Sequence, residues 1–184
     1  NRLVPAGGER EIGTPIDEEL GELVRVRTID LRTEEGRMRE NETLDAVATR
    51  QVEETLADGS RVMLHVVAHS KTGAHAPSLE CVDALRERFG DRVTVMIDAA
   101  QGRLSRLGLR DALAKGYLVM FTGSKFYGGP AFSGALFVPR ELWPDTTGLD
   151  QLSEGFSDYY TAPELPPEWE ELRTSLPAAP NLGL

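Results

Sequence analysis

The chain has 184 residues, of which 40% are hydrophobic and 27% are charged, and this length and composition suit one globular domain with a single core. Its net charge of -10 argues against a nucleic-acid partner, because binding to a phosphate backbone depends on clustered lysine and arginine. A single cysteine, Cys81, excludes an internal disulfide framework and is typical of a reducing compartment. No apolar run is long enough to span a bilayer and no signal-peptide pattern is found, so we expect a cytoplasmic protein that does not bind membranes.

The first part of the chain predicts a lead-in, a strand and a helix. Residues 1–22 contain two prolines and four glycines, which favours a lead-in segment without a buried face. Over residues 23–31 apolar and polar side chains alternate, and this pattern predicts a half-exposed edge strand. A helix that ends at Asp58-Gly59 comes next. Its apolar face is formed by Leu44, Val47, Ala48, Val52 and Leu56.

Three nearly continuous apolar runs follow, and each is typical of a strand that is covered on both faces in a parallel sheet. They span residues 61–68, 93–97 and 117–121. A helix between Pro77 and Gly90 separates the first two runs, and residues 105–116 predict a helix between the second and the third. Strand and helix alternating in this way indicate right-handed crossover units, and hence an α/β fold with a mainly parallel sheet.

The remaining segments complete the expected domain organisation. Residues 134–138 predict a further strand, whereas the chain after Pro139 is rich in proline and predicts only a short helix near residues 168–176. We therefore expect a lead-in at 1–22 and an α/β domain at 23–140. Residues 141–184 are predicted to be an irregular covering segment or the start of a second, smaller domain.

Polar residues follow each of the three apolar runs, at the point where each predicted strand ends. Because the carboxyl ends of parallel strands lie along one edge of the sheet, these residues are expected to converge although they are far apart in sequence. They are His69, Asp98, Gln101, Thr122, Ser124 and Lys125.

This set of side chains meets the requirements of pyridoxal 5'-phosphate. The cofactor needs a lysine that binds its aldehyde as an imine, a carboxylate that keeps the pyridine nitrogen protonated, a donor for the ring oxygen, and hydroxyl or backbone N–H groups for the phosphate. Asp98 ends an apolar strand, where a buried carboxylate without a cationic partner would be unfavourable, and a protonated ring nitrogen would be such a partner. Each residue also has an ordinary explanation: Lys125 as a solvated loop lysine, Asp98 as a turn or helix cap, and His69 and Gln101 as polar loop residues.

Three segments in this order resemble the class V branch of fold type I pyridoxal-phosphate enzymes, which includes aminotransferases, cysteine desulfurases and related lyases. The segments are DAAQG at 98–102, TGSKFYGGP at 122–130 and SGALFV at 133–138, and the resemblance covers residues 23–140. It implies a three-layer α/β/α large domain, a homodimer, and an amino acid or amine as the substrate of a transferase or lyase.

The resemblance also implies a role for each candidate residue. Lys125 would be the Schiff-base lysine and Asp98 the partner of the pyridinium nitrogen, and these two would be the catalytic residues. Gln101 would contact the ring oxygen and His69 the ring itself. The remaining pair, Thr122 and Ser124, would hold the phosphate.

Departures from the family pattern narrow the prediction. Ser124 stands where desulfurases usually have histidine, and Lys71 stands where they often have an acid. No cysteine follows Lys125. These departures favour an aminotransferase-like activity over desulfuration. Residues 1–22 contain no phosphate loop of the family type, and its small domain is missing. We therefore expect this chain to be the large-domain portion of a longer enzyme and to be inactive alone.

Other classes of function stay open at this point. One is a non-catalytic α/β scaffold domain that acts through a protein partner, and another is a phosphate- or nucleotide-binding domain that uses the same sheet edge. A metal site is not predicted, because His65 and His69 lie in a strand pattern, where four residues span about 13 Å, too far for one ion.

Overall fold

The computed structural model describes residues 17–130, 133–149, 152–158 and 160–178, and the chain forms two compact units. Arg27–Trp143 form one unit, here called the sheet unit. Asn1–Val26 and Pro144–Leu184 together form the other, here called the terminal unit. The two ends of the chain, which the sequence pattern treats as a lead-in and a covering segment, therefore belong to the same unit.

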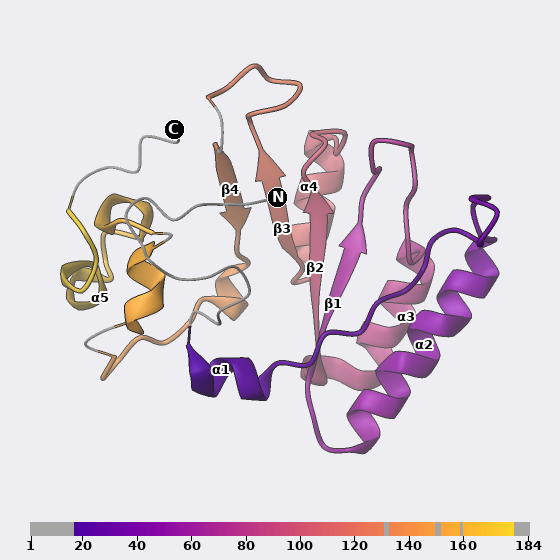
Figure 1. Ribbon diagram of the computed structural model, residues 1–184, viewed down its shortest axis with the longest axis horizontal. Helices are drawn as coiled ribbons and strands as arrows, with labels where there is room; N and C mark the ends of the chain where they lie inside the picture. Colours follow the sequence, from indigo (N-terminus) through magenta and orange to yellow (C-terminus); the bar gives the residue numbers. More distant parts are fainter. Residues whose placement is uncertain (1–16, 131–132, 150–151, 159, 179–184) are drawn as a thin grey trace. The chain divides into compact units, whose positions relative to one another are not determined.

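The sheet unit contains a four-stranded sheet with the order β1-β2-β3-β4 (Figure 1). The strands are β1 Val62–Val67, β2 Val93–Ala99, β3 Leu118–Thr122 and β4 Gly134–Phe137. The first three are parallel, and β4 is antiparallel to β3. The prediction of an α/β fold with a mostly parallel sheet is therefore confirmed, and the four strands lie where the apolar runs after residue 60 predict them.

Three helices connect or precede the parallel strands and pack against the same face of the sheet. They are α2 Asn41–Ala57, α3 Leu79–Phe89 and α4 Arg106–Ala114, and α2 also packs beside α3 (Figure 1). Their buried side chains, such as Val52, Val82, Leu85 and Ala112, form one hydrophobic core with the inward residues of the strands. These inward residues are Leu64, Val66, Val93, Val95, Ile97 and Val119.

The opposite face of the sheet carries no helix among the described residues of the sheet unit. In β1 only Leu64 and Val66 are buried, whereas Met63 is 60% exposed and His65 is also exposed. The expectation that β1 is covered on both faces is therefore wrong, and the three-layer arrangement expected from the resemblance is not seen in this unit. A continuous apolar run does not show whether a strand is covered on one face or on both, because methionine and valine also occur on the face of β1 that carries no helix.

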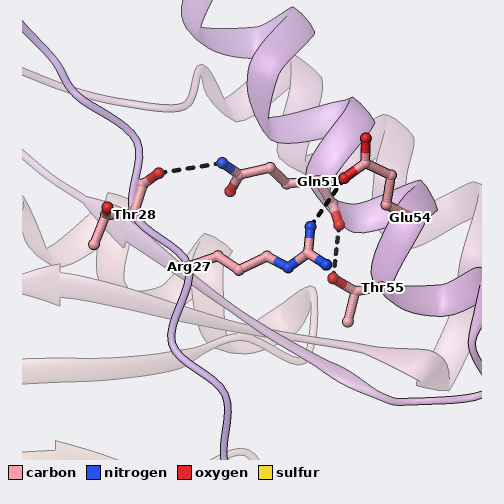
Figure 2. A network of polar contacts seen from close by, with 5 residues as sticks. All are labelled: Arg27, Thr28, Gln51, Glu54 and Thr55. Carbon is pink, nitrogen blue, oxygen red and sulfur yellow. Dashed lines mark hydrogen bonds and ion pairs between the residues drawn. The ribbon is translucent and has the colours of Figure 1, made fainter.

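Residues 23–31 do not form the predicted edge strand. Leu23 is the last residue of α1 Glu18–Leu23, and the side chains of Val24 and Val26 are 64% and 83% exposed. Within the sheet unit, the extended segment after Val26 is bound to α2 instead of to a strand, as Figure 2 shows. Arg27 Nη1 lies 2.9 Å from Glu54 Oε2, and Gln51 Nε2 donates to the Thr28 carbonyl over 3.1 Å. Without a covered face, alternating apolar residues do not stabilise a strand.

Short elements form the described part of the terminal unit. α1 has no buried residue, and Asp17 caps it by accepting a hydrogen bond of 2.8 Å from the amide of Leu20. Hydrogen bonds from Ser153 and from Leu20 lower the pKa of Asp17. α5 Glu170–Thr174 buries Leu172, and it confirms the short helix predicted near residues 168–176. The chain also has 3-10 turns at Gly90–Arg92, Arg140–Leu142, Glu154–Asp158 and Ala162–Glu164.

None of the helices in the described ranges combines the length and the apolar composition needed to cross a lipid bilayer.

The start of β3 is fixed by a polar cluster at its amino end. The Tyr117 hydroxyl donates a 2.6 Å hydrogen bond to Asp83 Oδ1, and Lys115 Nζ pairs with Asp83 Oδ2. Burial raises the pKa of Asp83, but the bonds from Lys115 and Tyr117 outweigh it and hold that pKa below its usual value. Burial and the bond to Asp83 raise the pKa of Tyr117, so the phenol stays protonated and donates.

Replacing Tyr117 with phenylalanine is expected to lower the free energy of unfolding by about 1–2 kcal/mol, because a hydrogen bond to a charged acceptor is lost. Urea denaturation measures this difference, with Tyr160→Phe as a control, since Tyr160 is 44% exposed. A depressed folded pKa stabilises the protein above the unfolded pKa, so the effect should be constant above about pH 5 and should shrink as Asp83 protonates below about pH 4. An effect that stays unchanged at low pH would contradict this role of Asp83.

Candidate functional site

The carboxyl ends of β1, β2 and β3 surround a cavity of about 350 Å³. Parallel strands deliver their following loops to the same edge, and here the three loops do meet there. Four of the six predicted site residues line this cavity: His69, Asp98, Gln101 and Lys125. Ser70, Lys71 and Thr72 line it as well.

Asp98 lies near the end of β2, on the face of the sheet that the helices leave open. Its side chain is 30% exposed, and Oδ2 lies 3.5 Å from Nε2 of His65 on the neighbouring strand. Oδ1 accepts a hydrogen bond of 2.9 Å from the amide of Ala100, as in an Asx turn. In contrast to the expectation, the carboxylate is therefore not fully buried: solvent reaches it, and an imidazole faces it. The carboxylate also fulfils the ordinary turn-capping role considered for it.

His69 lies two residues after the end of β1 and has a left-handed backbone conformation, with φ of 57°. Only a few per cent of non-glycine residues adopt this conformation, and they cluster at ligand sites and tight turns. The exposed imidazole of His69 meets the ring of His75 edge-on, with 5.3 Å between ring centroids. Burial lowers the pKa of His75, and the nearby His69 lowers it further, which favours the neutral form of His75.

The loop after β3 holds Lys125 through backbone hydrogen bonds at its base. Gly123 donates to the Ser133 carbonyl over 3.1 Å, and Gly129 donates to the Gly123 carbonyl over 2.8 Å. Lys125 lies in the turn that these two hydrogen bonds close, and its side chain is exposed at the rim of the cavity. The lysine is therefore presented by a turn with a defined backbone, although its own side chain is accessible.

Thr122 and Ser124 do not line the cavity, in contrast to the other four predicted site residues. The Thr122 hydroxyl donates to the Ser133 carbonyl over 2.6 Å, and it lies 2.8 Å from the hydroxyl of Ser124. It also accepts from the backbone amide of Ser124 over 3.2 Å. These bonds engage both hydroxyls inside the turn that carries Lys125, so here they stabilise the loop.

Three strand-end loops contact one another around the cavity. The hydroxyl of Tyr127 donates to the Gly102 carbonyl over 3.4 Å, and its ring lies 5.4 Å from that of Phe121. Gly102 has φ of 64°, and a Cβ there would come within 2.7 Å of the Tyr127 ring, so glycine allows the close approach. Arg103 Nη1 donates to the Ser70 carbonyl over 3.3 Å. The loops after β1, β2 and β3 are thus joined to one another by direct contacts.

Two cations at the carboxyl edge of the sheet are not among the site residues predicted from the sequence. Lys71 lines the cavity together with Lys125, although in the sequence it counts only as a departure from a family pattern. Arg103 contacts the loop of Ser70 but has no assigned role in the sequence pattern. Both follow a strand end within a few residues, as Lys125 does, and this position is the signal that could have identified them.

The turn that carries Lys125 can be tested through its glycines. A Cβ at position 129 would lie 2.8 Å from the Gly123 carbonyl oxygen and 2.9 Å from Ser133 Oγ, whereas a Cβ at position 128 would meet nothing within 4 Å. Gly129→Ala is expected to open the turn and to speed hydrogen exchange of the Gly123 amide by at least about tenfold, since that amide loses its bond to Ser133. Gly128→Ala, where φ is 64°, introduces only backbone strain and should leave this exchange nearly unchanged. Equal protection of Gly123 in both variants would show that Gly129 does not close the turn.

Among the described residues, no group of three or more His, Cys, Asp or Glu side chains is arranged to hold a metal ion. Neither the scan against protein-family models nor the search of curated proteins finds a match to this sequence. The lysine, carboxylate, amide and imidazole that line one cavity are therefore the features from which a function can be inferred.

Proposed function

We propose that this chain is the cofactor-binding portion of a pyridoxal-phosphate-dependent enzyme that acts on an amino acid or amine, with aminotransferase-like chemistry. One observation carries the proposal: Lys125, Asp98, Gln101 and His69 come from three different strand ends and line one cavity. The order of the segments at 98–102, 122–130 and 133–138 supports it, because it resembles that of class V enzymes of this kind.

The side chains of the cavity fit the groups of this cofactor. The volume of about 350 Å³ lies at the lower end of the range of small-ligand sites, which is about 300–1,000 Å³. Lys125 provides a primary amine that can bond to an aldehyde carbon, and Asp98 provides an accessible carboxylate that can accept a hydrogen bond from a protonated ring nitrogen. The amide of Gln101 can donate to a ring oxygen, and the imidazole of His69 can lie against the ring.

The residues of the chain then have distinct tasks. When bound, the cofactor supplies an aldehyde and an electron-accepting ring for reactions at the α-carbon of an amine. Lys125, once its amine is free, would move a proton at the α-carbon of the substrate. Asp98 would keep the ring nitrogen protonated, and His65 would limit the rotation of this carboxylate from 3.5 Å away. The resemblance further supports a homodimer, and the single cysteine, which is typical of a reducing compartment, supports a cytoplasmic location as part of the same proposal.

Labelling of lysines tests the proposal directly, because the chain contains only Lys71, Lys115 and Lys125. Lys115 pairs with Asp83, and it is absent from the cavity lining. The protein is incubated with pyridoxal 5'-phosphate, reduced with borohydride and digested, and the labelled peptides are identified by mass spectrometry. The proposal expects the label on Lys125 at low cofactor concentration. Equal labelling of all three lysines, or labelling of Lys71 or Lys115 alone, would contradict it.

A phosphate- or nucleotide-binding domain is a second candidate function. Lys71, Lys125 and Arg103 lie close together at this sheet edge, and this group of cations favours anionic ligands of several kinds. Saturable binding of a nucleotide, together with the absence of a borohydride-dependent label on Lys125, would favour this candidate over the first.

A further inference from the structure

We propose that Lys71 and Arg103 form, beside Lys125, a binding site for the oxyanion of a small molecule, either a phosphate or a carboxylate group. The existence of this site depends only on the cations and their surroundings, whereas the identity of its ligand rests on the proposed function. In that setting, the oxyanion is the phosphate of the cofactor or the carboxylate of an amino-acid substrate.

A second cavity, of about 340 Å³, adjoins the first one at the carboxyl edge of the sheet. It is lined by Lys71, Gln101, Arg103, Lys125 and Phe126. Lys71, Gln101 and Lys125 line both cavities, so a ligand in the first cavity can extend a charged group into the second. The second cavity therefore lies where a substituent of a ring or of a substrate would reach.

The charge of this second cavity is opposite to that of the whole chain. The chain has a net charge of -10, yet the described residues that line this cavity include three cations and no carboxylate. Four other cations of the sheet unit are paired with acids, in the pairs Arg27–Glu54, Arg86–Asp91, Arg88–Glu53 and Lys115–Asp83. No such pair involves Lys71, Arg103 or Lys125 among the described residues, so the three charges are available to a ligand.

Arg103 is already held in position to bind an anion. One of its N–H groups donates to the Ser70 carbonyl over 3.3 Å, and its Cζ lies 5.4 Å from the centroid of the Phe126 ring. A guanidinium has five N–H donors in a planar fork, so the others can bind the two oxygens of a carboxylate or phosphate. Because the backbone and the aromatic ring restrict Arg103, less conformational freedom is lost on binding.

Lys71 and Arg103 can contact a phosphate, whereas the two residues that the sequence predicts to hold it, Thr122 and Ser124, are engaged elsewhere. The hydroxyls of Thr122 and Ser124 are hydrogen-bonded to each other and within their turn, and neither lines the two cavities. Lys71 and Arg103, in contrast, line a cavity, and neither forms an ion pair with another residue of the described part of the chain. They are accordingly better placed than the two hydroxyls to bind a phosphate.

The first experiment measures anion binding without any cofactor. Inorganic phosphate and succinate are titrated separately into ¹⁵N-labelled protein, and NMR follows the side-chain Nε–H of Arg103 and the amides of Gln101 and Gly102. We expect saturable shifts in the wild type, which weaken as sodium chloride is raised because the charges are exposed. The variant Lys71→Gln/Arg103→Gln should bind the anions at least about tenfold more weakly, since charge-assisted contacts are lost.

A matched control removes the same number of charges from a nearby helix. Arg106→Gln/Arg110→Gln alters two exposed arginines of α4 that line neither cavity, and it should bind like the wild type. Urea denaturation of both double variants verifies that they are folded. Shifts that do not saturate, or an equal loss of binding in both double variants, would overturn the oxyanion site.

The second experiment distinguishes the two sources of the oxyanion. Borohydride labelling of Lys125 is compared between pyridoxal 5'-phosphate and pyridoxal, which lacks the phosphate. If the site binds the cofactor phosphate, the wild type should prefer the phosphorylated compound by at least about tenfold, and Lys71→Gln/Arg103→Gln should lose this preference. If the preference survives in that variant while succinate binding is lost, the site binds a carboxylate. Absence of any label on Lys125 would refute the proposed function, whereas the titrations would still decide the oxyanion site.

Discussion

Replacing Lys125 with alanine is expected to abolish covalent attachment of pyridoxal 5'-phosphate at this sheet edge. Lys125 lines both cavities, and it projects from a turn closed by backbone hydrogen bonds. Without its amine no bond to the aldehyde carbon can form at this position, and proton transfer at the substrate α-carbon should fall by about 10²–10⁴-fold. The imine absorbance that appears on adding the cofactor, and the mass of the borohydride-reduced protein, measure the loss.

Controls for this prediction come from the other two lysines of the chain. Lys115→Ala removes a lysine that pairs with Asp83, and Lys71→Ala removes one that lines both cavities with Lys125. Both variants should keep the label on Lys125, although Lys71→Ala should need more cofactor. Lys125→Arg keeps the positive charge but cannot form an imine, so it should behave like Lys125→Ala in labelling. An undiminished imine absorbance in Lys125→Ala would exclude this residue as the attachment site.

Replacing Asp98 with alanine is expected to leave the label on Lys125 but to remove most of the rate. The carboxylate is accessible and lines the same cavity as Lys125, so it can hold a proton on a ring nitrogen. Losing one preorganised electrostatic contact to developing charge typically lowers a rate by about 10²–10³-fold. Exchange of the α-hydrogen for deuterium across a panel of amino acids, followed by NMR in deuterated buffer, measures that rate in the enzyme of which this chain is the proposed cofactor-binding portion.

A matched variant distinguishes the carboxylate from its neighbour. His65→Gln removes the imidazole that lies 3.5 Å from Asp98 but keeps the carboxylate, and it should lower the rate only slightly. Asp98→Ala also loses the hydrogen bond to the Ala100 amide, so Asp98→Asn, which can retain that bond, is the more specific variant. A normal exchange rate in Asp98→Asn would show that Asp98 serves only as a turn cap.

The sequence predicts the strands correctly where their side chains are buried on one face of the sheet. Runs at 61–68, 93–97 and 117–121 become strands because Val66, Val95 and Val119 are buried against helices. The alternating segment 23–31 does not become a strand. A side-chain hydrogen bond holds its second half to α2, and the side chains of Val24 and Val26 are exposed. Periodicity describes which residues share a face, but it does not determine whether another element covers that face.

The candidate site is predictable only as far as topology determines it. Parallel strands bring His69, Asp98, Gln101 and Lys125 to one edge, and this convergence follows from strand order alone. The engagement of Thr122 and Ser124 within their own turn depends on the return of the chain at Ser133, which no local pattern specifies. Likewise, the pairing of Asp98 with His65 and of Arg103 with the Ser70 loop arises from tertiary packing.

A crystal structure of the borohydride-reduced protein with pyridoxal 5'-phosphate tests the central claim most directly. The account predicts that the pyridine ring occupies the cavity between β1 and β3, bonded to Lys125, with its nitrogen about 2.7–3.2 Å from a carboxylate oxygen of Asp98. A ring attached elsewhere, or a ring nitrogen directed to solvent while Asp98 contacts only His65 and Ala100, would contradict it.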